Sequence, residues 1–424
     1  MPILLIRARA MELELVTIGN ELLLGFTLDT NAAELATALA AAGVHVARAT
    51  TVPDDGDAIR GAVMDSLNRT GFVVTTGGLG PTRDDITKKI VADIFHAPLE
   101  LDTEYLEKLR QRFARLGHGP MSENNRTQAE VPRGAITMKN RWGTAPGLWL
   151  EGEPGIAVML PGVPLEMRGL LHGELLPRLK ERMGAGPQCT TRSRMLRTTG
   201  MPESALADVL KGVENQIAPA TLAYLPGPHG VDLRLTVWNA KAAEADGWLE
   251  KAVVFVRPLL GKQYYAEGDK DLAAVVLDAL AENSHRLAVA ESCTGGLIGE
   301  RLTAIPGSSA VFAGGVVAYD DKVKENVLGV PRRLLEETGA VSEPVAEAMA
   351  RGVAGRLGSS ASLAITGVAG PTGGTPEKPV GTVCIAAAVG KARRVVTLRL
   401  PGDRLEIRHR SAQAALNLVR GLLS

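Results

Sequence analysis

The feature that most constrains the fold is a regular alternation of apolar and amphipathic segments in the first hundred residues. Three apolar segments predict strands: LELVTIG (13–19), VHVARATTV (44–52) and GFVVTT (71–76). Three segments with helical spacing follow them: 30–43, 54–68 and 84–95. Strands that alternate with helices in this way form parallel sheets covered on both faces. We therefore expect a doubly wound α/β domain over residues 13–183, preceded by an N-terminal extension at 1–12.

The rest of the chain predicts two further folded parts. GAGPQ (184–188) has the composition of a linker, and residues 184–264 predict a small α+β module with a hairpin turn at PGPHG. Strands and helices alternate again over 265–424. The predicted fold class is α/β, with two α/β domains joined by the small α+β module.

Composition excludes several classes of protein. Lys+Arg and Asp+Glu both number 47, and aromatic residues make up only 4%, so direct nucleic-acid binding is not expected. No apolar run reaches the roughly 18 residues of a membrane span, so no membrane contact is expected. The cysteines are three in number, far apart, and without a CxxC pair: Cys189, Cys293 and Cys384. This usage is typical of a reducing cytoplasm, without disulfides or a zinc site.

The stretch AVAESCTGG (288–296) concentrates reactive side chains at one turn. An apolar strand leads into Ser292 and Cys293, and a helix is expected to begin near Thr294. Free amides at a helix N-terminus favour negative charge, so this turn could hold an oxyanion beside a nucleophile. Ser292 or Thr294 could equally serve only as a helix cap.

Three other segments of this domain carry polar residues after strands or at a helix start. Tyr319 and Lys324 follow one apolar strand, and a lysine can act as the base for a serine when burial lowers its pKa. ITGVAGPTGG (365–374) is a Gly-rich turn. Arg404 lies in the first turn of a helix, where the dipole disfavours a cation, so it indicates either an anionic partner or an exposed arginine that extends to solvent.

The N-terminal domain contains the Gly-rich segment VVTTGGLGPTRDDIT (73–87). Glycines before a helix N-terminus form a nest that can hold a phosphate. Asp84 and Asp85 could hold Mg²⁺ beside a diphosphate, or could simply cap the helix. Glu21 follows the first strand and is a further carboxylate. The segment is neither GxGxxG nor a P-loop.

The C-terminal motifs together resemble the CinA C-terminal domain, the nicotinamide-nucleotide amidase family. AESCTGG, KVKENVLGV, ITGVAGPTGG and PGDR carry this resemblance over 265–424. It implies that nicotinamide mononucleotide is hydrolysed to nicotinic acid mononucleotide and ammonia through a nicotinoyl acyl-enzyme, without a metal. The family's serine–lysine dyad falls on Ser292 and Lys324. The other residues that the resemblance assigns to catalysis or substrate binding are Tyr319, Thr366, Arg404, Gly295, Gly296 and Gly367. The rival interpretation is a Cys293 nucleophile with a histidine base, His285 or His409.

The N-terminal motifs resemble the CinA N-terminal domain, a relative of molybdopterin-binding MoaB/MoeA-type domains. GNELLLG, TGGLGPTRDD, NRTQA, GTAPG and LPGVPLEM carry this resemblance over about 13–175. It implies cleavage of ADP-ribose to AMP and ribose 5-phosphate with a divalent metal such as Mg²⁺, or binding of a pterin. The metal falls on Asp84, with Asp85 and Glu21 as further candidates. The residues expected to line the nucleotide are Gly77, Gly78, Gly80, Asn125, Arg126, Asn140 and Gly143. Leu79 departs from the pattern of the pterin enzymes.

Taken together, the motifs resemble a full-length CinA. The resemblance implies a cytoplasmic, homodimeric hydrolase with two activities in pyridine-nucleotide recycling, and its partners are small-molecule nucleotides. Two other functions stay open. The N-terminal domain could bind molybdopterin or adenylate a substrate, or the chain could be a non-catalytic partner in competence or DNA repair.

Overall fold

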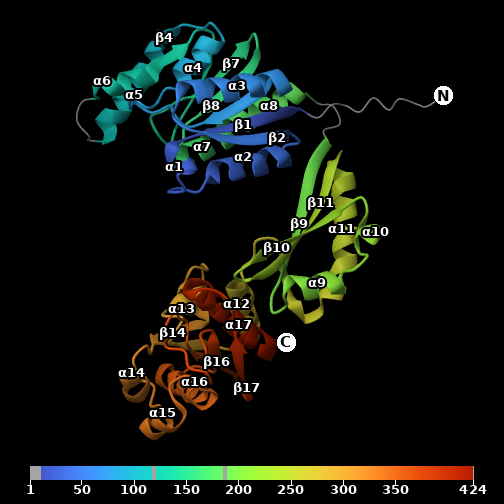
Figure 1. The fold of residues 1–424 in the computed structure, drawn as a ribbon, viewed down its shortest axis with the longest axis vertical. Coiled ribbons are helices and arrows are strands. Elements are labelled where there is room, and N and C mark those ends of the chain that lie inside the picture. Colours follow the sequence, from blue (N-terminus) through green and yellow to red (C-terminus); the bar gives the residue numbers. More distant parts are fainter. Residues whose placement is uncertain (1–10, 117–120, 185–188, 424) are drawn as a thin grey trace, which may run out of the picture. The chain divides into compact units, whose positions relative to one another are not determined.

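A computed structural model describes residues 11–116, 121–184 and 189–423 (Figure 1). The chain divides into two compact units, Met1–Arg192 with Val237–Asp246 and Ser193–Thr236 with Gly247–Ser424. Residues 1–10 of the predicted N-terminal extension and 185–188 of the predicted linker lie outside the described residues.

The first unit contains a six-stranded sheet. Its strand order is β2 (His45–Val52), β1 (Glu12–Ile18), β3 (Phe72–Thr76), β8 (Gly155–Leu160), β7 (Gly147–Gly152) and β6 (Ile136–Met138). The first four strands are parallel, as the alternation of strands and helices predicts. Strands β7 and β6 are antiparallel to their neighbours. Only Glu153 and Pro154 separate β7 from β8, and so short a connection joins antiparallel strands.

Helices cover both faces of this sheet. They are α1 (Asn20–Leu23), α2 (Thr30–Ala41), α3 (Gly56–Thr70), α4 (Thr87–Ile94), α5 (Thr103–Leu116), α6 (Glu123–Arg126), α7 (Pro164–Leu170) and α8 (Leu176–Met183), with a 3-10 turn at Thr127–Ala129 and a π-helical turn at Leu171–Leu175. A small two-stranded sheet pairs β4 (Leu99–Leu101) with β5 (Glu130–Pro132). On β1, Leu13 and Leu15 join the core under α2, α7 and α8, whereas Val16 and Ile18 join the core under α3 and α4. Alternate residues thus feed two cores, as a doubly wound sheet requires.

The middle module is a four-stranded sheet with helices. Its strand order is β10 (Thr221–Gly227), β11 (Gly230–Lys241), β9 (Cys189–Thr198) and β12 (Tyr264–Glu267), and its helices are α9 (Glu203–Val209), α10 (Glu214–Ile217) and α11 (Ala242–Leu260), followed by a 3-10 turn at Gly261–Gln263. β10 and β11 pair up to Gly227 and Gly230, so the predicted hairpin is confirmed. β12 pairs antiparallel with β9.

The C-terminal sheet has five strands. Their order is β14 (Phe312–Val317), β13 (Leu287–Glu291), β15 (Ala361–Gly367), β16 (Thr382–Val389) and β17 (Ala392–Arg399). The helices are α12 (Leu272–Glu282), α13 (Leu297–Thr303), α14 (Asp321–Asn326), α15 (Arg332–Thr338), α16 (Glu343–Leu357) and α17 (Arg404–Leu423), with a 3-10 turn at Ser308–Ala310. β14, β13 and β15 are parallel, and β16 and β17 continue antiparallel. The carboxyl ends of the three parallel strands therefore meet at one edge.

Both faces of this sheet are also buried. On β13, Leu287 and Val289 pack with α12, α13 and α17, whereas Ala288 and Ala290 pack with α16. The predicted α/β fold class is confirmed for both domains. Across the described part of the chain, no helix combines the length and apolar character needed to span a membrane.

One buried ion pair links three helices of the C-terminal domain. Arg301 of α13 is 8% exposed, and its Nη2 donates to both carboxylate oxygens of Asp271 at 2.9 Å and to Gln413 of α17 at 2.9 Å. Asp271 also caps α12 by accepting the amide of Ala273 at 2.7 Å. This carboxylate therefore neutralises a buried guanidinium and fixes a helix start.

We predict that Asp271→Ala destabilises the C-terminal domain by about 3–5 kcal/mol, because it leaves the buried charge of Arg301 without its anion. The matched control is Asp278→Ala on the same helix, whose exposed pair with Lys270 is worth at most about 1 kcal/mol. Hydrogen exchange of the α12 and β13 amides in the full chain measures the stability lost in each variant. Equal losses in the two variants would contradict the assignment.

Candidate active site

A cavity of about 200 Å³ opens where the carboxyl ends of β13, β14 and β15 meet. Ser292 directly follows β13, Tyr319 comes just after β14, and Thr366 is the second-last residue of β15. The cavity is lined by Ser292, Cys293, Tyr319, Asp321, Lys324, Ala340, Val341, Thr366, Gly367, Ala369 and Arg404. The structure thus brings together every residue predicted to be catalytic in this domain. Gly295 and Gly296 lie in the turn that follows Cys293.

The turn after β13 differs from the one expected. Helix α13 begins at Leu297 rather than near Thr294, and no side chain of its N-cap residue, Gly296, is available to cap it. Instead the carboxylate of Glu291 accepts the amides of Gly296, Ile298 and Gly299 at 3.0, 3.1 and 2.8 Å. The predictions that Ser292 or Thr294 caps the helix, and that its free amides face the site, are wrong because Glu291 already occupies them.

Three other amides of this turn do not contact Glu291. The amide of Ser292 donates to the carbonyl of Ile365 at 3.0 Å, which fastens the turn to β15. Among the described residues, the amides of Cys293 and Thr294 donate to no backbone or side-chain oxygen. Both amides contact the Cys293 thiol, so a developing oxyanion would have to replace that sulfur as their acceptor.

Lys324 is buried beside the serine. Only 1% of it is exposed, and it lies in the single turn and a half of α14. Its Nζ donates to the carboxylate of Asp321 at 2.8 Å and to the carbonyl of Tyr319 at 3.3 Å. Within the described part of the chain, Nζ has no hydrogen bond to Ser292. The two residues therefore line the same cavity, while the amine is bound to Asp321 and not to the serine.

Cys293 is poorly suited to be the nucleophile. Burial raises the pKa of its thiol to about 12, so the thiol stays neutral near pH 7, and the thiolate is the reactive form. Neither candidate base lines the cavity. His285 lies beside the Ser360 hydroxyl at 3.1 Å, and the ring of His409 packs against that of His229. Neither His285 nor His409 is therefore placed to act as a base for this cysteine.

Arg404 and Tyr319 form the mouth of the cavity. Arg404 is the first residue of α17, as predicted, and its Nη2 donates to the Tyr319 hydroxyl at 2.8 Å. Its Nη1 donates to the carbonyl of Gly370 at 2.6 Å. Thr366 donates its hydroxyl to the carbonyl of Ala340 at 2.8 Å and so joins β15 to the loop before α16. An exposed guanidinium thus stands beside a half-exposed phenol at the entrance.

The Gly-rich loop of the first unit follows β3 at the equivalent edge of its sheet. Gly77 has a φ of +112°, and a Cβ there would lie 2.2 Å from the carbonyl oxygen of Ile18, so only glycine fits. A Cβ on Gly78 would meet the Thr87 hydroxyl at 2.1 Å. That hydroxyl and Oδ1 of Asn31 are buried polar atoms without a partner among the described residues. Such atoms mark a place where a ligand or water completes the hydrogen bonding.

The two aspartates of this loop have separate roles. Helix α4 begins at Thr87 and not at Asp84, so the predicted helix start is wrong. Asp85 instead accepts the amide of Thr82 at 2.8 Å as well as the Thr82 hydroxyl, and it closes the loop beneath Gly80. A hydrogen bond from Thr82 lowers the pKa of Asp84, whose carboxylate is exposed.

The remaining residues predicted for this domain lie on several elements. Asn125 accepts the Ser122 hydroxyl at 2.6 Å, and Arg126 pairs with Glu123 at 3.0 Å. The Glu21 carboxylate folds back over Gly19. No group of three His, Cys, Asp or Glu side chains within the described ranges is arranged to hold a metal. The metal ligation by Asp84, Asp85 and Glu21 stays a prediction.

Asn140 and Gly143 belong to a tightly fixed turn. Asn140 accepts the amides of Trp142 and Gly143 at 2.9 Å and donates to the Glu166 carboxylate at 3.0 Å. A Cβ on Gly143 would lie 1.4 Å from the same carboxylate. Burial raises the pKa of Glu166.

The sequence analysis missed several residues of these sites. Asp321 was detectable, because it precedes Lys324 by three positions in a helical segment. The sequence did not distinguish Lys88 from its exposed neighbour Lys89. Burial lowers the pKa of Lys88 to about 8, and its Nζ donates to the carbonyl of Thr127, near Asn125 and Arg126. A lysine with a perturbed pKa beside a Gly-rich loop is a candidate for ligand contact.

Three family models match the chain. Residues 14–181 match the Probable molybdopterin binding domain, residues 193–266 the Damage-inducible protein CinA KH domain, and residues 269–423 the CinA C-terminal domain.

Full-length relatives cover nearly the whole chain. A CinA-like protein of Gemmatimonas aurantiaca is 53% identical over 413 residues, which are 97% of this chain and 96% of the relative. A Putative competence-damage inducible protein of Symbiobacterium thermophilum is 42% identical over 421 residues, 97% of this chain and 98% of its own length. Among solved structures, a competence/damage inducible protein of Agrobacterium tumefaciens is 39% identical and covers 36% of this chain and 94% of its own, with a TM-score of 0.35. The resemblance stated from the sequence motifs is confirmed, and the chain belongs to the CinA-like proteins, with a molybdopterin-binding-like N-terminal domain, a KH-type module and a CinA C-terminal domain.

Proposed function

We propose that the chain is a hydrolase with two activities on pyridine nucleotides. The C-terminal domain deamidates nicotinamide mononucleotide, and the N-terminal domain cleaves ADP-ribose. The observation that carries the first activity is the shared cavity of a buried lysine and a serine at the carboxyl ends of three parallel strands. The second rests on the Gly-rich loop with its unpartnered polar atoms and the anionic Asp84.

In the proposed amidase reaction, Ser292 Oγ attacks the carboxamide carbon of the nicotinamide ring. Lys324, once released from Asp321, takes the hydroxyl proton and then gives it to the departing nitrogen, so that ammonia leaves as the C–N bond breaks. The amides of Cys293 and Thr294 donate to the oxyanion. Water, deprotonated by Lys324, then attacks the nicotinoyl ester, and the serine regains its proton as the acid is released.

The size of the cavity supports an arrangement for the rest of the substrate. About 200 Å³ is less than the roughly 300–1,000 Å³ of a site that encloses a whole ligand. We therefore place only the nicotinamide ring inside. The ribose phosphate then extends past Tyr319 to Arg404, whose guanidinium is suited to bidentate contact with a phosphate.

The first prediction for this site separates the two possible nucleophiles. Ser292→Ala is expected to reduce ammonia release from nicotinamide mononucleotide by at least about a thousandfold, because the attacking oxygen is lost. Cys293→Ala is expected to keep most of the activity. An ammonia-release assay on the full chain checks both, and the reverse pattern would exclude the serine.

The second prediction concerns the ion pair of Lys324. Its Nζ must leave Asp321 before it reaches the serine hydroxyl, so Asp321→Asn is expected to maintain or raise kcat, whereas Lys324→Ala is expected to abolish turnover. Asp320→Asn, which alters the neighbouring cap of α14 instead, is the matched control. A loss in Asp321→Asn as large as that in Lys324→Ala would show that the carboxylate is itself required.

For the N-terminal domain, the residues of the Gly-rich loop fit a magnesium ion. Mg²⁺ is held in many proteins by one or two carboxylates together with substrate phosphates, so a cage of three protein ligands is not required. Asp84 would hold it, with Asp85 close by. Such an ion supplies charge stabilisation to a diphosphate under attack. The chain's own contribution is the loop of Gly77 and Gly78, which lets a diphosphate approach the backbone.

We predict that AMP release from ADP-ribose is abolished by chelator and falls at least about a hundredfold in Asp84→Asn. Arg83→Gln, the exposed neighbour, is the control variant. Turnover that is insensitive to chelator would refute the metal role. Tight binding of a pterin without AMP release would instead favour the alternative that the match to a molybdopterin binding domain suggests.

A further inference from the structure

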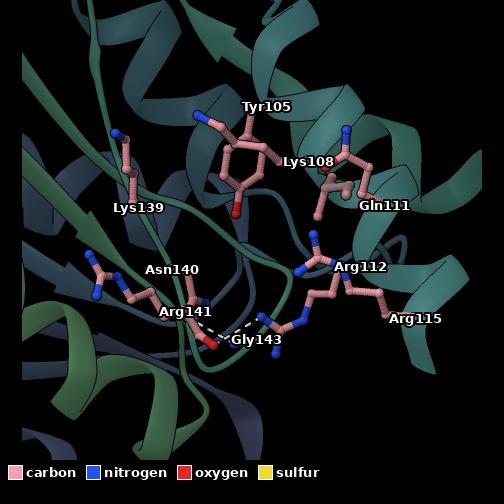
Figure 2. Close-up of a pocket in the computed structure, with 10 residues that line it drawn as sticks. Tyr105, Lys108, Gln111, Arg112, Arg115, Lys139, Asn140, Arg141 and Gly143 are labelled. Carbon is pink, nitrogen blue, oxygen red and sulfur yellow. Dashed lines mark hydrogen bonds between the residues drawn. The ribbon is translucent and has the colours of Figure 1, made fainter.

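A second cavity, of about 290 Å³, lies in the first unit between α5 and the turn that follows β6 (Figure 2). Half of its ten lining residues are cationic: Lys108, Arg112, Arg115, Lys139 and Arg141. No Asp or Glu is among those ten. Figure 2 shows Arg112 reaching from α5 toward the turn that carries Asn140 and Gly143.

Nearby carboxylates compensate these cations only in part, and Glu166 interacts electrostatically with Arg112. Lys108 pairs with Glu104, and the same carboxylate lies near Lys139. Arg112 donates Nη1 to the carbonyl of Arg141 at 3.0 Å. Within the part of the chain that the structure describes, Arg112, Arg115, Lys139 and Arg141 form no salt bridge. Like charges gathered in a concave site repel one another and produce a positive potential that an anion relieves.

The wall opposite α5 is rigid. Glu166 is wedged against Gly143 and accepts the Asn140 amide group, and Tyr105 donates its hydroxyl to the carbonyl of Thr144 at 3.2 Å. These bonds hold the backbone of the turn that carries Arg141. Preorganised groups bind more tightly because less conformational freedom is lost on association.

The segment that leads to Glu166 also reaches the Gly-rich loop. Gly162 lies four residues before Glu166, and its Cβ position is 3.4 Å from the Cα of Gly77. Asn31 also links the two loops, because its side-chain amide donates to Gly162 at 2.8 Å and to Thr76 at 3.1 Å. The basic cavity and the Gly-rich loop therefore flank one connected segment after β8.

We propose that the basic cavity binds the diphosphate of an anionic nucleotide. Guanidinium groups bind phosphate oxygens bidentately, and a group of cations compensated only in part matches a diphosphate better than a single carboxylate. The volume is at the lower limit for small-molecule sites and suits a compact ligand. Single strands of nucleic acid bind in open grooves with several stacking aromatics, whereas the one aromatic residue here, Tyr105, is buried. This inference rests on the proposed ADP-ribose activity only for the identity of the natural ligand that carries the diphosphate.

Calorimetric titration of the full chain with inorganic pyrophosphate, in low salt with chelator present, tests the proposal without turnover. Arg115→Glu and Arg141→Glu are expected to weaken binding at least tenfold, because each reverses a charge of the cavity on a different element. Arg110→Glu is the matched control, since Arg110 lies on α5 outside the cavity. Arg115 and Arg141 are exposed, and circular dichroism of each variant confirms that it is folded.

Competition identifies the source of the diphosphate. Displacement of pyrophosphate by ADP-ribose would make the cavity a substrate subsite, and simultaneous binding would make it a site for a separate diphosphate ligand; both outcomes support the proposal. Equal affinity in both reversal variants and wild type, or no pyrophosphate binding, overturns it, as does a preference for single-stranded RNA. Arginine-dependent binding without AMP release from ADP-ribose would refute the pyrophosphatase activity alone.

Discussion

The buried carboxylate of Glu291 determines the conformation of the turn on which the C-terminal site depends. By accepting three amides at the start of α13, it holds the chain in a sharp bend through Gly295 and Gly296. Ser292 then projects into the cavity while its own amide is fastened to β15. The positive end of the α13 dipole is consequently neutralised by Glu291. In the proposed reaction, an oxyanion beside Ser292 would therefore have to draw on other donors, such as the amides of Cys293 and Thr294 that now contact the Cys293 thiol.

The two α/β domains place their candidate sites at the same edge of the sheet but supply different chemical groups there. In each, parallel strands bring glycine-containing turns to one sheet edge, where the backbone can approach a ligand. In the C-terminal domain that edge holds a buried amine and a serine, which suits acyl transfer. In the N-terminal domain that edge holds an exposed carboxylate and unpartnered polar atoms. A basic cavity lies across the segment that follows β8. Those groups suit a phosphorylated ligand.

Local sequence patterns predicted the strands and most helices, because alternation of apolar residues reports burial directly. They also selected Ser292, Lys324, Tyr319 and Arg404, since strand-end turns of a parallel sheet converge. These patterns failed where the local structure depends on a hydrogen-bond partner or packing contact that the pattern does not indicate. The start of α13 depends on Glu291 and the closure of the Gly-rich loop on the bond from Asp85 to Thr82. The basic cavity forms only when α5 packs opposite the turn at Asn140, which no local pattern shows.

In the proposed amide hydrolysis, Ser292 carries the acyl group. Acid quenching of the full chain in the first turnovers with nicotinamide mononucleotide, followed by fragment mass spectrometry of the peptide that contains AESCTGG, tests it directly. We expect a nicotinoyl nucleotide ester on Ser292 that decays as product appears. An adduct on Cys293, or unmodified peptide throughout continuing ammonia release, would contradict it.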